Sequence, residues 1–332
     1  MEKFVCHVAT VMLRRFGSKK TNAELAINSK LLLNSDEHSL RTMLKDHNIE
    51  PERLSEMLRN IQDWYNRQPH LPDAQLHDQL VTRLLIMRKF SLQKVKEKID
   101  NYFTARNSMV DLLSNRDPLM SELNQYLKSG YWIVLPRKTP EKHRITIFKM
   151  KNCDGKSVIL LIKVIFMIAD YRLWNDTVMG EQFILDFENI TIQLATQLTP
   201  VLISKIVFYV TSCIGAKLKG LHLVHLPKHA AFMFSLFKKL MKPKLVKRIK
   251  QYNSFEEAMR EFPEDIFPND LGGTDDVTCQ EITDAWVRTL SSPDWRHYFL
   301  EQDSIRSDES KRISAKMSNF GIEGSFKTLN ID

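Results

Sequence analysis

Three short apolar runs, separated by helical segments, constrain the fold of this chain most strongly. RITIFKM (144–150), QFILDFE (182–188) and LKGLHLVHL (218–226) are rich in β-branched and aromatic residues, as strands buried on both faces of a parallel sheet are. Between them lie VILLIKVIFMIADYRLW (158–174) and TPVLISKIVFYVTSC (199–213), which have the length and composition of buried helices. Strands that alternate with helices predict right-handed crossovers, and therefore an α/β fold.

The N-terminal third has the period of amphipathic helices. PERLSEMLRNIQDWYNRQ (51–68) places Pro51 at a first-turn position, and apolar residues then recur every three or four positions. LHDQLVTRLLIMRKF (76–90) and SLQKVKEKIDNYFTARNSMVDLL (91–113) repeat this pattern, with Ser91 as a predicted N-cap. We therefore expect a small helical bundle ahead of the α/β unit.

With 332 residues, the chain exceeds the usual size of a single core, so two packed units are expected. An N-terminal extension (1–34) precedes the helical domain, which we place at 35–115. The α/β domain follows at 116–303. The Ser- and charge-rich remainder, 304–332, has little periodicity and is predicted to be a mobile tail.

Charge and cysteine content narrow the partners and the compartment. The net charge of +8 and a pI near 9.2 favour polyanionic partners, either nucleic acid or an anionic membrane surface. Cys6, Cys153, Cys213 and Cys279 are far apart, without CxxC spacing. This pattern indicates free thiols in a reducing compartment and no zinc site or disulfide framework.

No membrane span or secretory signal is predicted. The most apolar stretch, 158–171, is interrupted by Lys163 and Asp170 and is shorter than the ~20 apolar residues that a bilayer requires. The N-terminal FVCHVATVML (4–13) lacks the basic start and small-residue cleavage site of a signal peptide. The acid-free, basic segment 3–20 is compatible with a presequence or with an ordinary solvated N-terminus.

Catalytic motifs are missing from the sequence. It contains no GxSxG, GxxxxGK[ST], GxGxxG or HExxH pattern, so we expect no enzyme. His222 and His225 point to opposite faces of a strand and His229 lies beyond a proline, so these three histidines are not expected to converge on a metal. Asp186 and Glu188 end a predicted strand, where active sites collect, or else cap the next helix or pair with a lysine.

Residues 227–250, PKHAAFMFSLFKKLMKPKLVKRIK, combine an apolar helix with a basic run and contain no acid. Three interpretations fit this composition. The helix could face the core with a solvated basic edge, or it could be a calmodulin-type target. It could also be a lid over an apolar cavity, with its basic end touching anionic headgroups. Composition alone does not choose among them.

Four segments in a fixed order resemble the CRAL-TRIO lipid-transfer family, and within it the insect proteins similar to α-tocopherol transfer protein and cellular retinaldehyde-binding protein. They are RLLIMRKFSLQKVKEKIDNY (83–102), FILDFENI with QLTP (183–200), LKGLHLVHLP (218–227) and FPEDIFPNDLGG (262–273). The resemblance implies a helical N-terminal unit packed on an α/β sandwich. That sandwich would enclose one hydrophobic ligand beneath a mobile gate helix, on which the basic stretch 227–250 falls.

The resemblance also implies two sets of site residues. A basic cleft for phosphoinositide headgroups would be formed by Arg88, Lys217, Lys219, Lys244 and Arg248. Lys219 stands where an arginine is common in the tocopherol branch, which keeps the charge but loses the bidentate fork. The cavity would be lined by Tyr131, Phe148, Leu160, Val164, Leu185, Leu198, Ile206, Val210 and Leu221, and on the gate helix by Phe232, Met233, Leu236 and Phe237.

One departure from the family pattern bears on the ligand. Where the tocopherol branch has small hydroxyl residues that can hold a polar group, this chain has Met167 and Lys163. Tocopherol is therefore not assigned, and retinoid, carotenoid, sterol and phospholipid stay open. FPNDLGG (267–273) is expected to be a turn required by the backbone, with no direct role in ligand binding.

The resemblance thus implies a monomeric cytoplasmic carrier, without metal or cofactor, that exchanges a hydrophobic molecule at endosomal or other phosphoinositide-bearing membranes. Nucleic acid is not an expected partner. The alternative is a membrane-recruited interaction or signalling module whose cavity is vestigial.

Overall fold

A five-stranded sheet forms the centre of the computed structural model, which describes residues 31–33, 44–74, 76–150, 155–176, 178–228, 231, 234–235, 238–239 and 243–313. The strands are β1 (Trp132–Lys138), β2 (His143–Lys149), β3 (Gly180–Asp186), β4 (Leu218–Val224) and β5 (Ile249–Tyr252). They follow one another in chain order across the sheet. β1 is antiparallel to β2, and the other three pairs are parallel. The three predicted strands are thus β2, β3 and β4.

Strand register divides the sheet into two faces. Phe148 of β2 pairs with Trp132 on one side and with Leu185 on the other, and Leu185 pairs with Leu223. Because paired residues in a sheet point to the same side, these four side chains share one face, together with Phe183 two residues before Leu185. This face, which we call the cavity face, is the one toward which helices α9 (Val158–Asn175) and α11 (Pro200–Phe208) lie.

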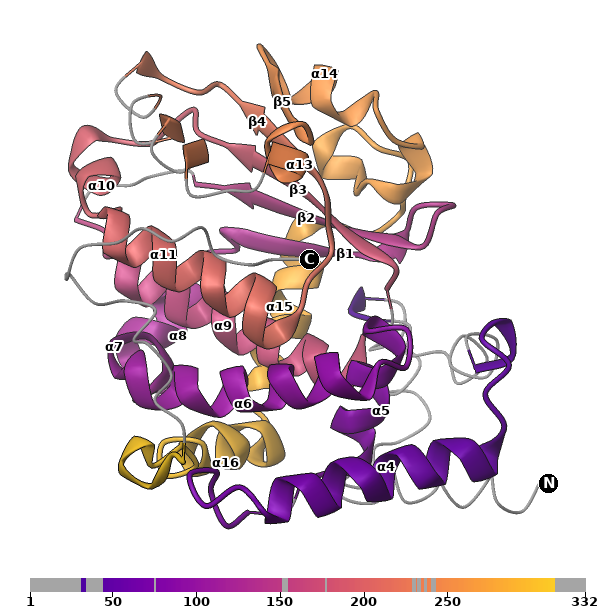
Figure 1. The fold of residues 1–332 in the computed structure, drawn as a ribbon. Helices are drawn as coiled ribbons and strands as arrows, with labels where there is room; N and C mark the ends of the chain where they lie inside the picture. Colours follow the sequence, from indigo (N-terminus) through magenta and orange to yellow (C-terminus); the bar gives the residue numbers. More distant parts are fainter. Residues whose placement is uncertain are drawn as a thin grey trace.

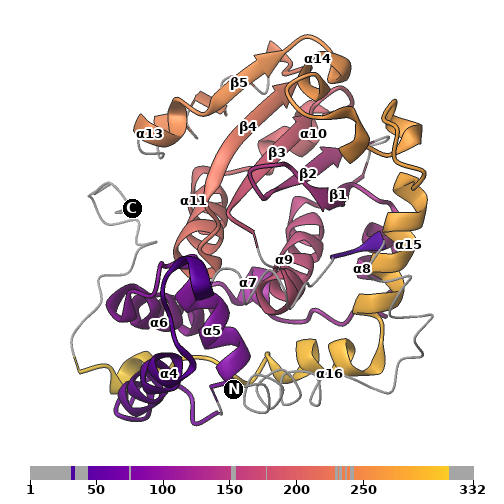
Figure 2. The ribbon, with the colours of Figure 1, turned by 90° about the vertical axis from the view of Figure 1, so that its right-hand side faces the viewer.

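The helices build further layers below the sheet. Figure 1 shows α9 and α11 beneath the sheet, then α6, and finally α4 and α16 at the bottom. Figure 2 shows the N-terminal helices gathered at one lower corner, away from β5 and α14. The N-terminal and middle helices are α4 (Pro51–Asn66), α5 (Asp78–Met87), α6 (Leu92–Ser108), α7 (Val110–Leu113), α8 (Ser121–Lys128) and α10 (Ile192–Thr196). The C-terminal helices are α13 (Pro243–Val246), α14 (Phe255–Met259), α15 (Cys279–Leu290) and α16 (Pro293–Glu301).

Local sequence explains where the N-terminal helices begin. Pro51 is the first residue of α4, and Leu54, Ile61 and Tyr65 of this helix are buried. Ser91 occupies the N-cap of α6, as predicted, but its side chain makes no capping hydrogen bond. Within the described residues, no helix is sufficiently long and apolar to cross a membrane.

A buried carboxylate joins the helical layers. Asp170 of α9 accepts hydrogen bonds from Arg116 at 2.9 Å and from the Tyr209 hydroxyl at 2.5 Å, and Arg106 of α6 lies 3.4 Å away. Asp170 and Arg116 are fully buried. Because a charge buried without partners is costly, this network fixes α6 against α9 and the segment after α11.

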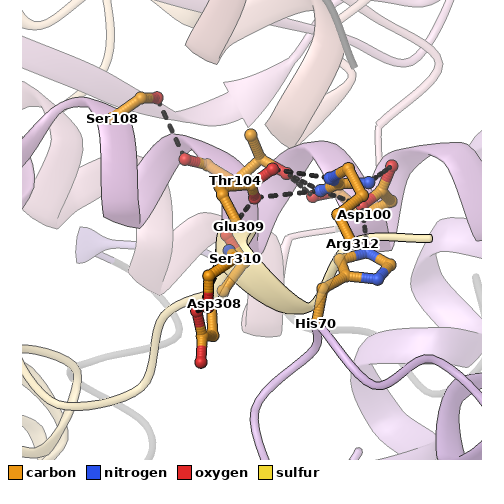
Figure 3. A network of polar contacts seen from close by, with 9 residues as sticks. His70, Asp100, Thr104, Ser108, Asp308, Glu309, Ser310 and Arg312 are labelled. Atoms are coloured by element: carbon orange, nitrogen blue, oxygen red, sulfur yellow. Dashed lines mark hydrogen bonds and ion pairs between the residues drawn. The ribbon is translucent and has the colours of Figure 1, made fainter. Parts of the chain in front are cut away.

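The first part of the predicted tail is anchored. Arg312 donates to Asp100 of α6 at 2.9 and 3.2 Å and to Glu309 (Figure 3). Ser307 is buried. The backbone N–H of Asp308 donates to the carbonyl of His70. The prediction of a mobile tail from residue 304 therefore needs correction for 304–312, because paired charges hold this segment on α6; residues 314–332 lie outside the described part.

FPNDLGG (267–273) forms the predicted turn: it follows the 3₁₀ helix Glu264–Ile266 and contains a second one, Asn269–Leu271. Gly272 has φ +89°, and a Cβ on Gly273 would lie 2.0 Å from the carbonyl oxygen of Phe267. Both glycines are therefore required by the backbone.

Candidate functional site

A cavity of about 80 Å³ lies between the cavity face of the sheet, helix α9 and the π-helical segment Tyr209–Ile214 that follows α11. Its apolar wall includes Trp132 and Phe183 from the sheet, Ile165 and Ala169 from α9, and Val210 and Ile214 from the segment after α11. At one end the lining turns polar, with Arg172, Asp176, Glu181 and Lys217. The cavity is thus an apolar space with a charged end.

The predicted cavity positions divide into three groups. Val210 lines this cavity, and Tyr131 and Val164 line a smaller one of about 10 Å³ beside α8 and α15. The sheet positions Phe148, Leu185 and Leu221 lie on the cavity face, but they line neither of these two cavities. The last group, Leu160, Leu198 and Ile206, is partly buried against the core and lines neither cavity. That the residues of all three groups contact the ligand stays a prediction.

The sequence missed the α9 residues that line the cavity. Ile165, Ile168, Ala169 and Arg172 do so, and their spacing of three and four residues places them on one side of the helix. Lys163 faces elsewhere, because its ammonium donates to the carbonyl of Ser114 at 2.7 Å. Met167 is fully buried in the core. The two residues that replace the family's hydroxyls therefore lie outside the cavity lining.

The predicted gate helix is only partly described. Residues 228, 231, 234–235 and 238–239 are helical, in agreement with the predicted helix. Lys238 places its ammonium 5.1 Å from the ring centre of Phe234. The four predicted lid contacts, Phe232, Met233, Leu236 and Phe237, and likewise His229, lie outside the described residues.

The polar end of the cavity is a charge-balanced network of two arginines and two carboxylates. Arg144 of β2 donates to Asp176 at 2.6 and 3.1 Å, and Arg172 of α9 donates to Asp176 at 3.0 Å and to Glu181 at 2.7 Å. Burial alone would raise the pKa of Asp176, but the two arginines hold that pKa well below its usual range. For Glu181, burial outweighs Arg172 and raises the pKa.

A second charged group, next to this network, has an excess of cations, and Glu97 is the carboxylate whose charge acts on its Arg88. Arg88, the C-cap residue of α5, lies against Gly215, where an added Cβ would stand 2.1 Å from Nη2 of Arg88. Gly215 has φ +81°, so a side chain there is disfavoured by both conformation and space. The Nε and Nη2 atoms of Arg88 are buried without a hydrogen-bond partner in the described part of the chain.

The lysines beside Arg88 increase this positive charge. Burial, followed by repulsion from Arg88, Lys89 and Lys219, lowers the pKa of Lys217 to about 8. Lys219 is exposed, and its side chain lies over Gly180 at the start of β3. Repulsion from Lys219 also adds to burial in lowering the pKa of His143. Cations at this spacing destabilise one another unless an anion binds between them.

Arg248 completes what we call the basic cluster: Arg88, Lys217, Lys219 and Arg248. Its guanidinium donates to the carbonyl of Leu218, which lies between the two lysines on β4. Lys244 is exposed on α13, four residues before Arg248. The structure therefore brings four of the five predicted headgroup residues to one edge of the sheet and places the fifth on the adjoining helix.

Lys98 is a further cation that the sequence reasoning missed. It lies on α6 and donates to the carbonyl of Thr211 at 2.6 Å, which caps the π-helical turn Tyr209–Ile214. Burial, with a contribution from Arg88, lowers the pKa of Lys98 to about 7. The available signal was its place between Val95 and Ile99, next to the buried face of the helix.

Asp186 and its neighbours form a separate polar group at the other end of β3. Asp186 pairs with Lys149 at 3.2 Å and with His225 at 2.9 Å, so the predicted pairing with a lysine is confirmed. Asp186, Glu188 and His225 each bring one potential ligand atom within 4.8 Å of the others. Because Lys149 already compensates the Asp186 charge and His225 is hydrogen-bonded to the same carboxylate, we assign no metal here. His222 instead bonds Gln182 and Tyr252.

Comparison with protein families matches two parts of the chain. Residues 128–273 match the CRAL/TRIO domain, and residues 50–123 match the domain described as Pinta-like, UBA domain. The domain limits predicted from sequence, 35–115 and 116–303, stay a prediction.

Two curated proteins and one solved structure illustrate the relationship. The chain is 22% identical to Clavesin-1 from Xenopus laevis over 253 residues, 75% of each protein. It is 21% identical to the alpha-tocopherol transfer protein-like protein from Mus musculus over 229 residues, 68% of this chain and 66% of that one. "Crystal structure of Sfh5" matches with a TM-score of 0.37 and 11% identity, over 65% of this chain and 81% of that one.

Proposed function

Because the chain belongs to the CRAL/TRIO family through residues 128–273, we propose that it is a carrier that binds one hydrophobic molecule and exchanges it at phosphoinositide-containing membranes. Lipid binding and transfer follow from the family. The ligand, the phosphoinositide and the cytoplasmic location belong to the proposal, as do the absence of catalysis, metal and cofactor and the monomeric state.

The observation that carries the proposal is the position of the basic cluster beside the cavity. Lys217 belongs to both, because it lines the cavity and lies beside Arg88 and Lys219. A phosphate group that approached this edge would meet the two unpartnered nitrogens of Arg88, which are already desolvated. Charge-assisted hydrogen bonds to phosphate are among the strongest available to such a group.

The exposed and buried cations in and beside the basic cluster would act differently. Lys219 and Lys244 are exposed and would attract an anionic surface from a distance, each contributing about 1 kcal/mol near the membrane. Arg88 is held by its packing on Gly215 and would read the geometry of the headgroup. We propose that this contact biases the gate toward an open state, because an anion that binds more tightly to the open form shifts the population toward it.

Native mass spectrometry of the protein purified from cells tests the carrier function. A carrier should retain close to one lipid per chain, which extraction would release for identification. A chain that retains no lipid and takes up none from vesicles would contradict the proposal. It would instead favour the membrane-recruited module with a vestigial cavity.

A further inference from the structure

One oxygen atom at the polar end of the cavity has no partner. Glu181 is 5% exposed and lines the cavity, and its Oε1 accepts a hydrogen bond from Arg172 at 2.7 Å. Its Oε2 is buried and has no hydrogen-bond partner within the described residues. Buried polar atoms are nearly always hydrogen-bonded, so an orphan acceptor at a cavity wall calls for an explanation.

The neighbouring carboxylate is different. Both oxygens of Asp176 are occupied, Oδ1 by Arg144 at 2.6 Å and Oδ2 by Arg144 and Arg172 at 3.1 and 3.0 Å. The network therefore satisfies three of its four carboxylate oxygens from within the protein. The remaining one, Oε2 of Glu181, belongs to a residue that lines the cavity.

From this geometry we infer that the ligand carries a neutral hydroxyl group, which donates a hydrogen bond to Oε2 of Glu181. This inference rests on the proposed carrier function and names the chemistry of its ligand. The ion pair with Arg172 at 2.7 Å favours the ionised form of Glu181 against the effect of burial. An ionised carboxylate accepts hydrogen bonds and donates none, so the partner of Oε2 must be a donor. The apolar remainder of the ligand would lie along Phe183, Trp132 and Val210.

A charged ligand end fits this end of the cavity less well than a hydroxyl does. A ligand carboxylate has no donor for Oε2 and would face the carboxylate of Glu181, and a ligand ammonium would donate to Oε2 but would also face the cations Lys217 and Arg172. An aldehyde or ester offers only acceptors and would leave Oε2 unpaired. Such a site discriminates against a ligand that leaves one of its buried polar groups without a hydrogen-bond partner. If Glu181 binds the polar group of the ligand, positions 163 and 167 need not contact that group, so Lys163 and Met167 are compatible with a bound ligand.

A matched series of probes tests the inference: 1-tetradecanol, tetradecanal and tetradecanoic acid, titrated calorimetrically into the delipidated full-length protein. The wild type should bind the alcohol at least about tenfold more tightly than the aldehyde or the acid, because a hydrogen bond to a charged group is at stake. In Glu181→Gln, the amide oxygen can keep the bond to Arg172 while the amide NH₂ replaces the orphan acceptor. The ratio of alcohol to aldehyde affinity should then fall to about one.

The control variant is Glu188→Gln, which removes the same charge at an exposed position outside the cavity and should keep the wild-type ratio. Thermal unfolding checks that both variants fold. If Glu181→Gln does not fold, the wild-type series still decides.

Equal affinities of the wild type for the alcohol and the aldehyde would overturn the inference and leave the carrier function intact. Water would then be the partner of Oε2. A lipid retained from cells that has no O–H or N–H donor would likewise overturn the inference. Failure to bind any probe or to retain any lipid would overturn the carrier function itself.

Discussion

Two charged groups lie side by side at the start of β3 and β4, and they are built on opposite principles. In the balanced network, Arg144 and Arg172 face Asp176 and Glu181, and the charges cancel. In the basic cluster, cations such as Arg88 adjoin one another, and Arg88 has two unpartnered nitrogens. One backbone hydrogen bond, from Glu181 N–H to the carbonyl of Lys217 at 2.9 Å, joins the two groups.

This difference in charge balance indicates separate roles for the balanced network and the basic cluster. A balanced buried network is complete without a partner, apart from the single oxygen of Glu181, so it fixes structure and orients whatever enters the cavity. Uncompensated cations at an edge store repulsion that an external anion would relieve. The following predictions separate these roles.

The largest effect is expected from breaking the balanced network. Asp176→Ala would leave Arg144 and Arg172 without their shared carboxylate, and removing one partner of a buried ion pair costs about 3–5 kcal/mol. We expect a matching fall in the free energy of unfolding in denaturant titrations. The control is Asp111→Ala, which breaks an exposed ion pair with Lys205 and should cost about 1 kcal/mol or less. Equal losses in the two variants would contradict the structural role of the network.

Neutralising two cations of the basic cluster together with Lys244 on the adjoining α13 should weaken membrane binding and leave the fold intact. The variant with Lys217, Lys244 and Arg248 changed to Gln should bind phosphoinositide-containing liposomes about two decades more weakly, from ~1 kcal/mol for each lost charge. Binding of the wild type should also weaken at high salt, because exposed charges are screened over ~10 Å at 0.1 M. Ligand affinity in solution should change much less than liposome binding, because Lys217 is the one of the three that lines the cavity.

A control with the same loss of charge changes Arg53, Arg59 and Arg260 to Gln, three exposed positions outside the cluster. This variant should bind the liposomes much more tightly than the cluster variant does. Should the two variants weaken equally, net charge alone would explain binding and the cluster would be an ordinary solvated surface.

Filling the cavity from the sheet side should block uptake. Leu221 is 5% exposed on the cavity face. In Leu221→Trp, the indole should occupy ligand volume and abolish lipid uptake with little loss of stability. Overpacking an already filled core instead costs about 1–3 kcal/mol. A variant that melts much earlier, in a protein whose wild type never takes up lipid, would identify Leu221 as plain core.

The smallest effect concerns pH. The lowered pKa of Lys217, about 8, means that its charge is present below pH 8 and is lost as the pH rises through that value. An ordinary lysine loses its charge only near pH 10.4. Liposome binding should therefore weaken by a few-fold between pH 7 and pH 9. The same titration on Lys217→Arg should be flat over this range, and a flat wild-type profile would show that Lys217 is not in the binding surface.

The sequence predicted the elements that have an unambiguous pattern. β2, β3 and β4 were found because they are continuous runs of apolar residues, and α4 because its apolar residues recur with helical period. β1 was missed because Pro136 argues against a strand interior; it is tolerated here since β1 lies at the edge of the sheet. The four-residue β5 has too little sequence to show alternation.

The cavity lining was harder to predict for a physical reason. α9 is apolar on nearly all sides, so its sequence does not distinguish one helix face from another and does not tell which residues face the sheet. Leu160 was carried over from the family resemblance, and the helix pattern gave no means to identify Ile165 and Ala169, which line the cavity. The positions of the basic cluster came from the family resemblance, whereas the orphan oxygen of Glu181 depends on three-dimensional contacts that no linear motif records.

The most direct test of the central claim is the rate of ligand transfer from the loaded protein to acceptor vesicles with and without phosphoinositide. A carrier that couples docking to release should transfer its ligand faster to the phosphoinositide vesicles, and the cluster variant should lose that difference. Chelator or omission of ATP should leave the rates unchanged. Transfer at one rate to both kinds of vesicle, in wild type and variant alike, would contradict the account.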